Sequence, residues 1–166
     1  EAVLAVTNAL RSAGNRKLMA PALVEHAMKL MDASGAAAAF LDSSNGTIFF
    51  GPRRGRLKKW KSLRLPTGGG VTGFVIGQAA PAFSGSGKSI VPQLDPAEVE
   101  QLDEAWYCVP LTVQNQAIGA LWVTRPVPFS AYDRRVLAAI ADIAASAMYR
   151  AQLQEQTELR LQRMAA

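Results

Sequence analysis

Side chains that commonly carry catalysis are scarce in this chain. Cys108 is its only cysteine and His26 its only histidine, and they fall in separate predicted elements, a strand and a helix. A nucleophile needs a base within hydrogen-bond reach, so no Cys–His or Ser–His–Asp set is available. No paired catalytic carboxylates are evident, and a Cys-based zinc site would need more thiols. The residue types therefore disfavour an enzyme, and Cys108 is expected to be a small buried hydrophobe.

Two glycine-containing stretches resemble phosphate-binding loops. Gly87-Lys88-Ser89 ends like a P-loop, but Ala82 holds the position of the required earlier glycine, so that match fails. Residues 68–73 match G-x-G-x-x-G letter for letter. No βαβ alternation surrounds them, so we do not interpret them as a dinucleotide site. Backbone N–H groups where the following helix begins could still hold an anion.

The strongest charge feature is a run of bases without a single acid. Its members are Arg53, Arg54, Arg56, Lys58, Lys59, Lys61 and Arg64. Without these seven of its 18 bases, the chain, which has 13 acids, would be slightly acidic, so its net charge of +5 is a local property. One interpretation is a patch for an anionic ligand or nucleic acid, with Trp60 as a stacking surface. We favour a solvated strand with Trp60 pointing inward, because Lys59 and Lys61 flank it at period two; nucleic acid is disfavoured.

Size and composition bound the rest. The chain has 166 residues, of which 49% are hydrophobic and 19% charged, which fits one globular domain with an appended helix. No stretch approaches the roughly 20 apolar residues of a membrane span. A lone cysteine suits a reducing compartment. We therefore expect a cytoplasmic protein without a membrane partner.

Apolar periodicity and turn signals predict helices at both ends of the chain and strands in its middle. The predicted helices are Pro21 to Gly35 and residues 1–13, 71–78 and 130–164, and the predicted strands are residues 36–41, 47–50, 81–83, 106–111 and 117–123. Residues 85–88 are predicted as a loop, with a helical turn from Pro96. Ser130 and Asp133 resemble a capping box. This order predicts an α+β fold with an antiparallel sheet.

Several of these segments together resemble a GAF domain over about residues 20–150. Residues 109–121 are similar to the last hairpin of that family, Phe129-Ser130-x-x-Asp133 to the start of its closing helix, and Gly70 to Ile76 to its glycine-led pocket helix. The resemblance implies about six strands, terminal helices on one face, and a pocket on the other face covered by loops and short helices. The expected core residues are Phe40, Val109, Leu111, Ile118, Leu121, Val123, Leu137 and Ile140.

The resemblance implies a ligand pocket without naming the ligand, because GAF domains bind cyclic nucleotides, bilins, haem, amino acids, inorganic ions or nothing detectable. Bilin-binding members use a thiol commonly followed by histidine near the pocket helix, and Cys108 does not match that pattern. A covalent bilin is therefore disfavoured, as is haem with only His26 available, and the cofactor stays unknown. Large apolar side chains in the segments that line the pocket of the family are Trp60, Phe74, Phe83 and Trp106. We expect these four to contact a small molecule.

The last predicted helix carries a 3-4 apolar spacing that is typical of the seam between two helices. Its members are Leu137, Ile140, Ala144, Ala147 and Ala151. After Arg150 the helix becomes polar and would be marginal alone. We therefore expect a homodimer through the terminal helices, although a single frayed surface helix remains the alternative. Residues 1–150 form the expected GAF domain, with a leading helix at 1–19, and residues 151–166 begin a coiled-coil linker.

Three functions follow from these observations. The first is a regulatory sensor that binds a small molecule and controls a downstream output domain, such as the histidine kinase of a two-component system, a diguanylate cyclase or a phosphodiesterase. The second is a degenerate GAF domain that only dimerises and transmits a signal. The third and least favoured is a small-molecule reductase, because the methionine-sulfoxide-reducing members of the family need more than one thiol.

Overall fold

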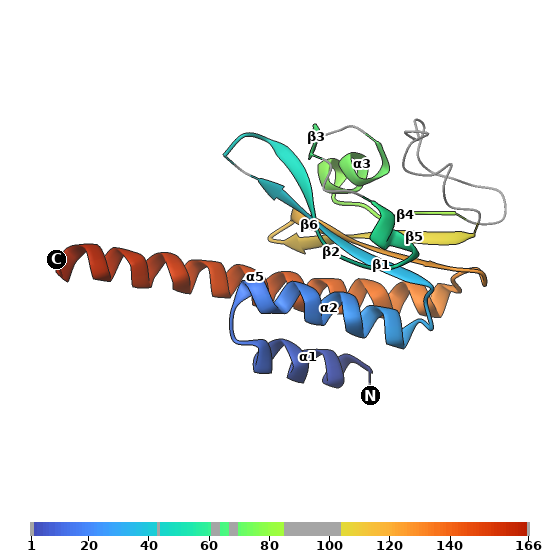
Figure 1. Ribbon diagram of the computed structural model, residues 1–166, viewed down its shortest axis with the longest axis horizontal. Coiled ribbons are helices and arrows are strands. Elements are labelled where there is room, and N and C mark those ends of the chain that lie inside the picture. Colours follow the sequence, from blue (N-terminus) through green and yellow to red (C-terminus); the bar gives the residue numbers. More distant parts are fainter. Residues whose placement is uncertain (1, 43, 61–63, 67–69, 85–103, 166) are drawn as a thin grey trace.

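The computed structural model describes residues 2–42, 44–60, 64–66, 70–84 and 104–165 (Figure 1). The described helices are α1 (Ala2–Ala13), α2 (Arg16–Leu30), α3 (Gly70–Gln78), α5 (Ala131–Ala165) and the 3-10 helix η1 (Arg56–Lys59). The strands are β1 (Gly35–Asp42), β2 (Thr47–Gly55), β3 (Arg64–Pro66), β4 (Ala82–Phe83), β5 (Ala105–Val113) and β6 (Gln116–Arg125). They form one antiparallel six-stranded sheet in the order β3-β2-β1-β6-β5-β4, which confirms the predicted α+β class.

The sheet separates two layers. Helices α1, α2 and α5 lie together along one face, and α3 lies on the other (Figure 1). We call these the helix face and the α3 face. The terminal helices therefore share one side of the sheet, as the resemblance implied, although their sequences lie at opposite ends of the chain.

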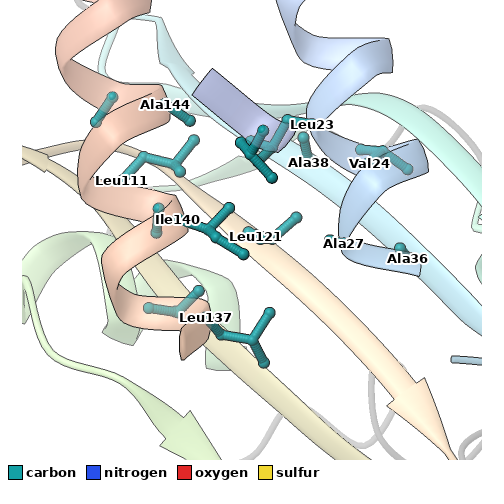
Figure 2. Packing of buried hydrophobic residues seen from close by; sticks show 14 of the residues in the cluster. Leu23, Val24, Ala27, Ala36, Ala38, Leu111, Leu121, Leu137, Ile140 and Ala144 are labelled. Carbon is teal, nitrogen blue, oxygen red and sulfur yellow. The ribbon is translucent and has the colours of Figure 1, made fainter. Parts of the chain in front are cut away.

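Aliphatic side chains fill the space between the sheet and its helices (Figure 2). Leu23 of α2, Leu121 of β6 and Ile140 of α5 are each fully buried there. Of the predicted core residues, six are buried, namely Val109, Leu111, Leu121, Val123, Leu137 and Ile140. Phe40 and Ile118 are half-buried and pack against the same cluster. The core prediction is thus confirmed in full at six positions and in part at these two.

The alanine-rich strand β1 lies at the centre of the sheet, between β2 and β6. Its small side chains alternate between the two cores, with Ala36 and Ala38 on the helix face and Ala37 and Ala39 on the α3 face. Gly119 on β6 lies opposite β1, and a Cβ there would come within 2.3 Å of the Ala39 carbonyl oxygen. The absence of a side chain at Gly119 therefore allows β1 to lie close to β6 at this position.

Helix α2 begins earlier than predicted. Asn15 is its N-cap, and the Asn15 side chain accepts a hydrogen bond of 3.1 Å from the Leu18 amide. The helix therefore starts at Arg16, and Pro21 lies inside it instead of opening it. Asparagine is among the strongest N-cap residues, so the cap overrode the proline signal.

The base-rich segment does not form the predicted strand around Trp60. Strand β2 runs to Gly55, whose φ of 60° turns the chain into the 3-10 helix η1. A Cβ at Gly55 would lie 2.0 Å from the Ser34 carbonyl oxygen, so this turn requires glycine. Trp60 follows η1 and is buried, as expected, but a tight helical turn directs it inward.

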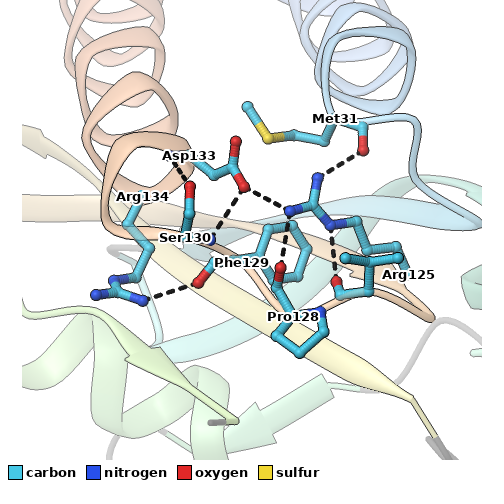
Figure 3. Close-up of polar contacts among 8 residues, drawn as sticks. Met31, Arg125, Pro128, Phe129, Ser130, Asp133 and Arg134 are labelled. Atoms are coloured by element: carbon cyan, nitrogen blue, oxygen red, sulfur yellow. Dashed lines mark hydrogen bonds and ion pairs between the residues drawn. The ribbon is translucent and has the colours of Figure 1, made fainter.

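Helix α5 begins at the predicted capping box (Figure 3). The Ser130 amide donates to the Asp133 carboxylate at 3.0 Å, and the Asp133 amide donates to the Ser130 hydroxyl at 3.1 Å. Arg125 at the end of β6 donates to Asp133 and to the carbonyls of Val127, Pro128 and Met31. The Arg125 guanidinium thus ties the start of α5 to the end of α2.

Within the described part of the chain, α5 alone has the length and apolar composition that a membrane crossing would need. A core helix of a soluble protein meets the same criteria, and 33% of the apolar window of α5 is buried inside the fold. The predictions for residues 85–88 and around Pro96 lie outside the described residues, as do Gly68 and Gly69 of the glycine-rich match.

Candidate functional site

Three tryptophans meet on the α3 face of the sheet. Trp122 of β6 is fully buried, and the exposed fractions of Trp60 and Trp106 are 7% and 3%. The Trp122 ring centroid lies 5.0 Å from that of Trp60 and 5.3 Å from that of Trp106. Phe50 of β2 continues the cluster, 5.4 Å from Trp60. We call these four side chains the tryptophan cluster.

The alternation of side chains along the strands determines which residues enter the tryptophan cluster. Trp106 and Cys108 of β5 and Trp122 of β6 point to the α3 face, and the residues between them point to the helix face. Neighbouring strand β1 contributes Ala37 and Ala39 to the buried core of the α3 face, and Leu41 packs half-buried against it. Because the alanine side chains of this central strand are small, the indole rings can occupy the space above it.

Helix α3 covers the cluster and bonds to it. The Trp122 indole N–H donates to the Thr72 hydroxyl at 3.0 Å, and both side chains are fully buried. Val71, Val75 and Ile76 of α3 are buried against the same layer. A hydrogen bond between two buried polar groups fixes the helix relative to the sheet, because leaving either group unpaired would be costly.

A second set of polar contacts on this face is centred on Glu104, the residue directly before β5. Its carboxylate accepts hydrogen bonds from the Ser34 hydroxyl and, at 2.8 Å, from the Thr124 hydroxyl. Arg56 of η1 lies 3.2 Å from its other oxygen. The Glu104 side chain is only 6% exposed, so these contacts compensate the charge that is buried there.

The sequence matches the family model of the GAF domain over residues 15–148. The chain belongs to the GAF domain family. The match covers the sheet, helix α3 and the part of α5 that packs on the sheet. It begins at the Asn15 cap of α2 and leaves out α1 and the tail of α5.

Solved structures share this GAF fold. The GAF domain of a phosphoenolpyruvate-protein phosphotransferase from Coxiella burnetii has a TM-score of 0.76 at 17% identity, over 93% of this chain and 95% of that one. Free methionine-R-sulfoxide reductase from Neisseria meningitidis, in complex with its substrate, has a TM-score of 0.76 at 15% identity, over 93% and 90%. GAF-B of DevS from Mycobacterium smegmatis has a TM-score of 0.66 at 19% identity, over 83% and 96%. No curated protein sequence matches this GAF domain.

Three of the four predicted pocket residues lie on the α3 face of this GAF domain. Trp60 and Trp106 belong to the tryptophan cluster, and Phe74 of α3 is half-buried against it. Phe83 lies apart, because Ala82 takes the α3 face of β4 and Phe83 takes the helix face. There its ring lies 5.9 Å from Tyr107 and 4.6 Å from the Arg134 guanidinium carbon.

Trp122 and Phe50 of the tryptophan cluster were not among the predicted site residues, and neither was Thr72. Trp122 is the ring that the other two tryptophans contact, and Thr72 is its hydrogen-bond partner. The signal for Trp122 was its alternation with Leu121, which was expected in the core, because adjacent strand residues point to opposite faces. Thr72 had no comparable signal, since its role depends on a strand 50 residues away.

Cys108 and His26 lie in different layers of the GAF domain. Cys108 is fully buried on the α3 face, whereas His26 is half-buried on α2 beyond the opposite face of the sheet. The structure does not bring them together. Among the described residues, no three His, Cys, Asp or Glu side chains cluster in a way that could hold a metal ion.

The residues of the predicted dimer seam face the interior of the chain. Leu137, Ile140 and Ala144 have no exposed surface, and Ala151 is 9% exposed. Ala147 and Ala151 line a groove of about 220 Å³ that α5 forms with α1 and the start of α2. These side chains therefore pack on the core of their own chain, and a partner could reach only the groove-lining end of the stripe.

Beyond Ala151, helix α5 leaves the body of the domain (Figure 1). Its tail exposes four large apolar side chains, namely Leu153, Leu159, Leu161 and Met164. Their exposed fractions range from 44% at Leu153 to 82% at Met164, so nothing in the described part of the chain covers this end of α5.

Proposed function

We propose that this GAF domain is a cytoplasmic regulatory module in which a small molecule bound on the α3 face changes the position of α5 and so controls a linked output domain. One observation carries the proposal. Helix α5 is continuous from Ala131 to Ala165, with its first half packed on the sheet and its tail exposed beyond the domain. A movement at the sheet can therefore be transmitted along one rigid element.

The sheet supplies the connection between ligand and helix. Trp106 of β5 lies in the tryptophan cluster, and the next residue, Tyr107, faces the helix layer. There the Tyr107 ring lies 6.0 Å from Phe129, the residue before the capping box of α5. A ligand that displaced Trp106 would thus move a strand whose other face supports α5.

A ligand screen tests this function. Ligand pockets are mostly apolar with a few polar anchors, and the α3 face offers aromatic rings beside Thr72 and Glu104. A thermal-shift screen of nucleotides, amino acids, haem and common metabolites should yield a stabilising compound. At about 100 times its dissociation constant, a single ligand adds about 2.7 kcal/mol to the free energy of unfolding. If no compound stabilises the domain, the sensory function is wrong.

A degenerate GAF domain that only dimerises is the second candidate. The observation that favours it is the mutual burial of Trp60, Trp106 and Trp122, whose rings fill the α3 face by contacting one another. The same screen separates the two candidates, because a degenerate domain gains no stability from any compound yet still self-associates.

Dimerisation would use the tail of α5. Its four exposed apolar side chains need a partner in water, and residues 151–166 would continue into a coiled-coil linker. Arg150 and Glu155 lie five residues apart, the spacing at which flanking charges pair between two parallel helices. Analytical ultracentrifugation should show a dimer at high micromolar concentration, and Leu161→Glu should make it monomeric. A wild-type monomer at that concentration would contradict the dimer.

We also propose that this domain has no catalytic activity of its own. One similar structure is a free methionine-R-sulfoxide reductase, so reductase turnover is the activity to measure. Cys108 is fully buried, and a thiol must be accessible as its thiolate to attack a sulfoxide. Reduction of free methionine sulfoxide that Cys108→Ser abolishes would overturn this proposal.

A further inference from the structure

Three arginines within four residues have three different partners. Arg54 of β2 reaches Glu25 of α2 at 3.9 Å, and Arg56 of η1 reaches Glu104 at 3.2 Å. Arg53 instead donates from its guanidinium to the main-chain carbonyl of Trp60. Among the described residues it has no acidic partner, so its positive charge is not balanced there.

The strand register fixes the face on which Arg53 lies. Arg53 pairs with Ala37 of β1, whose side chain is buried on the α3 face. Residues opposite each other in an antiparallel pair point to the same face, so Arg53 also points to the α3 face. Its guanidinium donates to the main-chain carbonyl of Trp60, whose ring is part of the tryptophan cluster. Arg53 is half-buried, and its guanidinium is held beside the main chain of a cluster residue.

The remaining donors of Arg53 suit an anion. A guanidinium carries five N–H donors in a planar fork that matches a carboxylate or phosphate, and one carbonyl does not use them all. Within the described ranges, the Glu104 carboxylate on the α3 face is already engaged by two hydroxyls and Arg56. Lys58 and Lys59 of η1 are exposed without an ion-pair partner in the described part of the chain, and they add positive potential.

We propose that Arg53 binds the anionic group, a carboxylate or a phosphate, of a small molecule whose apolar body lies against the tryptophan cluster. This inference rests on the proposed sensory function and names the ligand class of the same site. The Trp60 carbonyl holds the guanidinium in place, so little side-chain entropy is lost when the anion binds.

Titration with minimal anions tests Arg53 without knowledge of the natural ligand. Acetate, inorganic phosphate and neutral acetamide are added to the ¹⁵N-labelled chain at constant ionic strength, and the amide resonances of Arg53 and Trp60 are followed. At least one of the two anions should shift these resonances saturably. Whichever of acetate and phosphate binds more tightly shows whether the site prefers a carboxylate or a phosphate. Acetamide should bind at least about tenfold more weakly, which corresponds to about 1.4 kcal/mol. No saturable shift with either anion, or an equal shift with acetamide, overturns the proposal.

Variants at two arginines locate the effect. Arg53→Gln should weaken anion binding at least about tenfold, and Arg54→Gln, whose partner Glu25 lies on the helix face, should leave it unchanged. Arg53→Lys keeps the charge but loses the planar fork of donors, so its affinity for the anion should lie between those of wild type and Arg53→Gln. This conservative variant also keeps the test valid if Arg53→Gln fails to fold. Equal binding by wild type and both Arg53 variants overturns the proposal. A neutral compound that stabilises wild type and Arg53→Gln alike would overturn it while leaving the sensory function standing.

Discussion

Leu121 and Trp122 are neighbours on β6, and their side chains enter two different cores. On the helix face Leu121 meets aliphatic side chains from α2 and α5 (Figure 2). On the α3 face Trp122 meets two other indoles and a buried hydroxyl, in a layer that also holds the carboxylate of Glu104. Buried polar groups cost free energy unless they are paired.

From this difference we infer that the two faces have different roles, one in stability and the other in ligand recognition. The helix face gains its stability mainly from the burial of apolar side chains, which is non-directional. The α3 face combines aromatic surface with oriented polar groups, the composition that ligand sites share. Substitutions on the two faces should therefore separate stability from recognition.

The largest loss of stability is expected on the helix face. Leu121→Ala should lower the free energy of unfolding by about 2–5 kcal/mol, because it leaves a cavity in a fully buried layer. Urea unfolding at neutral pH measures this change. Val127→Ala, at an exposed side chain that follows β6, is the control and should change it by less than about 0.5 kcal/mol. Equal effects of the two variants would contradict the placement of the core.

The next largest effect concerns the buried carboxylate. Glu104→Gln should lower the free energy of unfolding by about 1–3 kcal/mol, because it removes the negative charge that pairs with Arg56 and accepts hydrogen bonds from two hydroxyls. Glu25→Gln is the matched control. Its carboxylate is exposed, and the hydrogen bond and charge of Lys29 lower its pKa, with a smaller contribution from Arg54. Urea unfolding should show no measurable change for Glu25→Gln, and a loss as large as that of Glu104→Gln would break the comparison.

A smaller loss is expected where α3 joins the sheet. Thr72→Val keeps the shape of the side chain but removes the acceptor of the Trp122 indole N–H, which should cost about 1 kcal/mol. Thr157→Val is the control, since the Thr157 hydroxyl bonds only to the Leu153 carbonyl on the exposed tail. If heat unfolding gave both variants the wild-type stability, this hydrogen bond would not hold α3 in place.

The capping box of α5 should contribute a small, pH-dependent term. Burial opposes the charge on Asp133, but hydrogen bonds from Ser130 and Arg125 outweigh it and hold the Asp133 pKa below its ordinary value of 3.8. A lowered pKa stabilises the fold above the unfolded value, and that stability is lost as the pH falls through the folded value. Asp133→Asn should therefore cost about 0.3–1 kcal/mol at pH 7, and the difference from wild type should shrink by pH 3. A gap that widened on acidification would contradict this sign.

Local sequence was sufficient for the elements whose signals lie within a few residues. The hairpin of β5 and β6 turns at Gln114 and Asn115, which both adopt positive φ, and its two predicted strands pair with each other. The Ser130–Asp133 capping box is equally local. The Asn15 cap of α2 is local as well, because its side chain bonds to the amide of Leu18, three residues along the chain. Such elements are determined by neighbours in sequence, so a single chain suffices to predict them.

The site was predicted less completely because its parts meet only through the sheet. The face that Phe83 takes depends on the register of a two-residue strand, which periodicity cannot determine. The 3-4 spacing of Leu137, Ile140 and Ala144 shows which side of the helix is apolar. It does not show whether a sheet or a second helix covers that side, and here the sheet and its helices do.

The indole resonances of the three tryptophans test the central claim most directly. The chain has three tryptophans, and all of them lie in the cluster, so every indole N–H peak in a ¹H–¹⁵N spectrum reports on the α3 face. Addition of a compound that stabilises the domain should shift the Trp60 and Trp106 peaks in proportion to occupancy. If a stabilising compound left all three indole peaks unmoved, the ligand would bind elsewhere, and the assignment of recognition to the α3 face would be wrong.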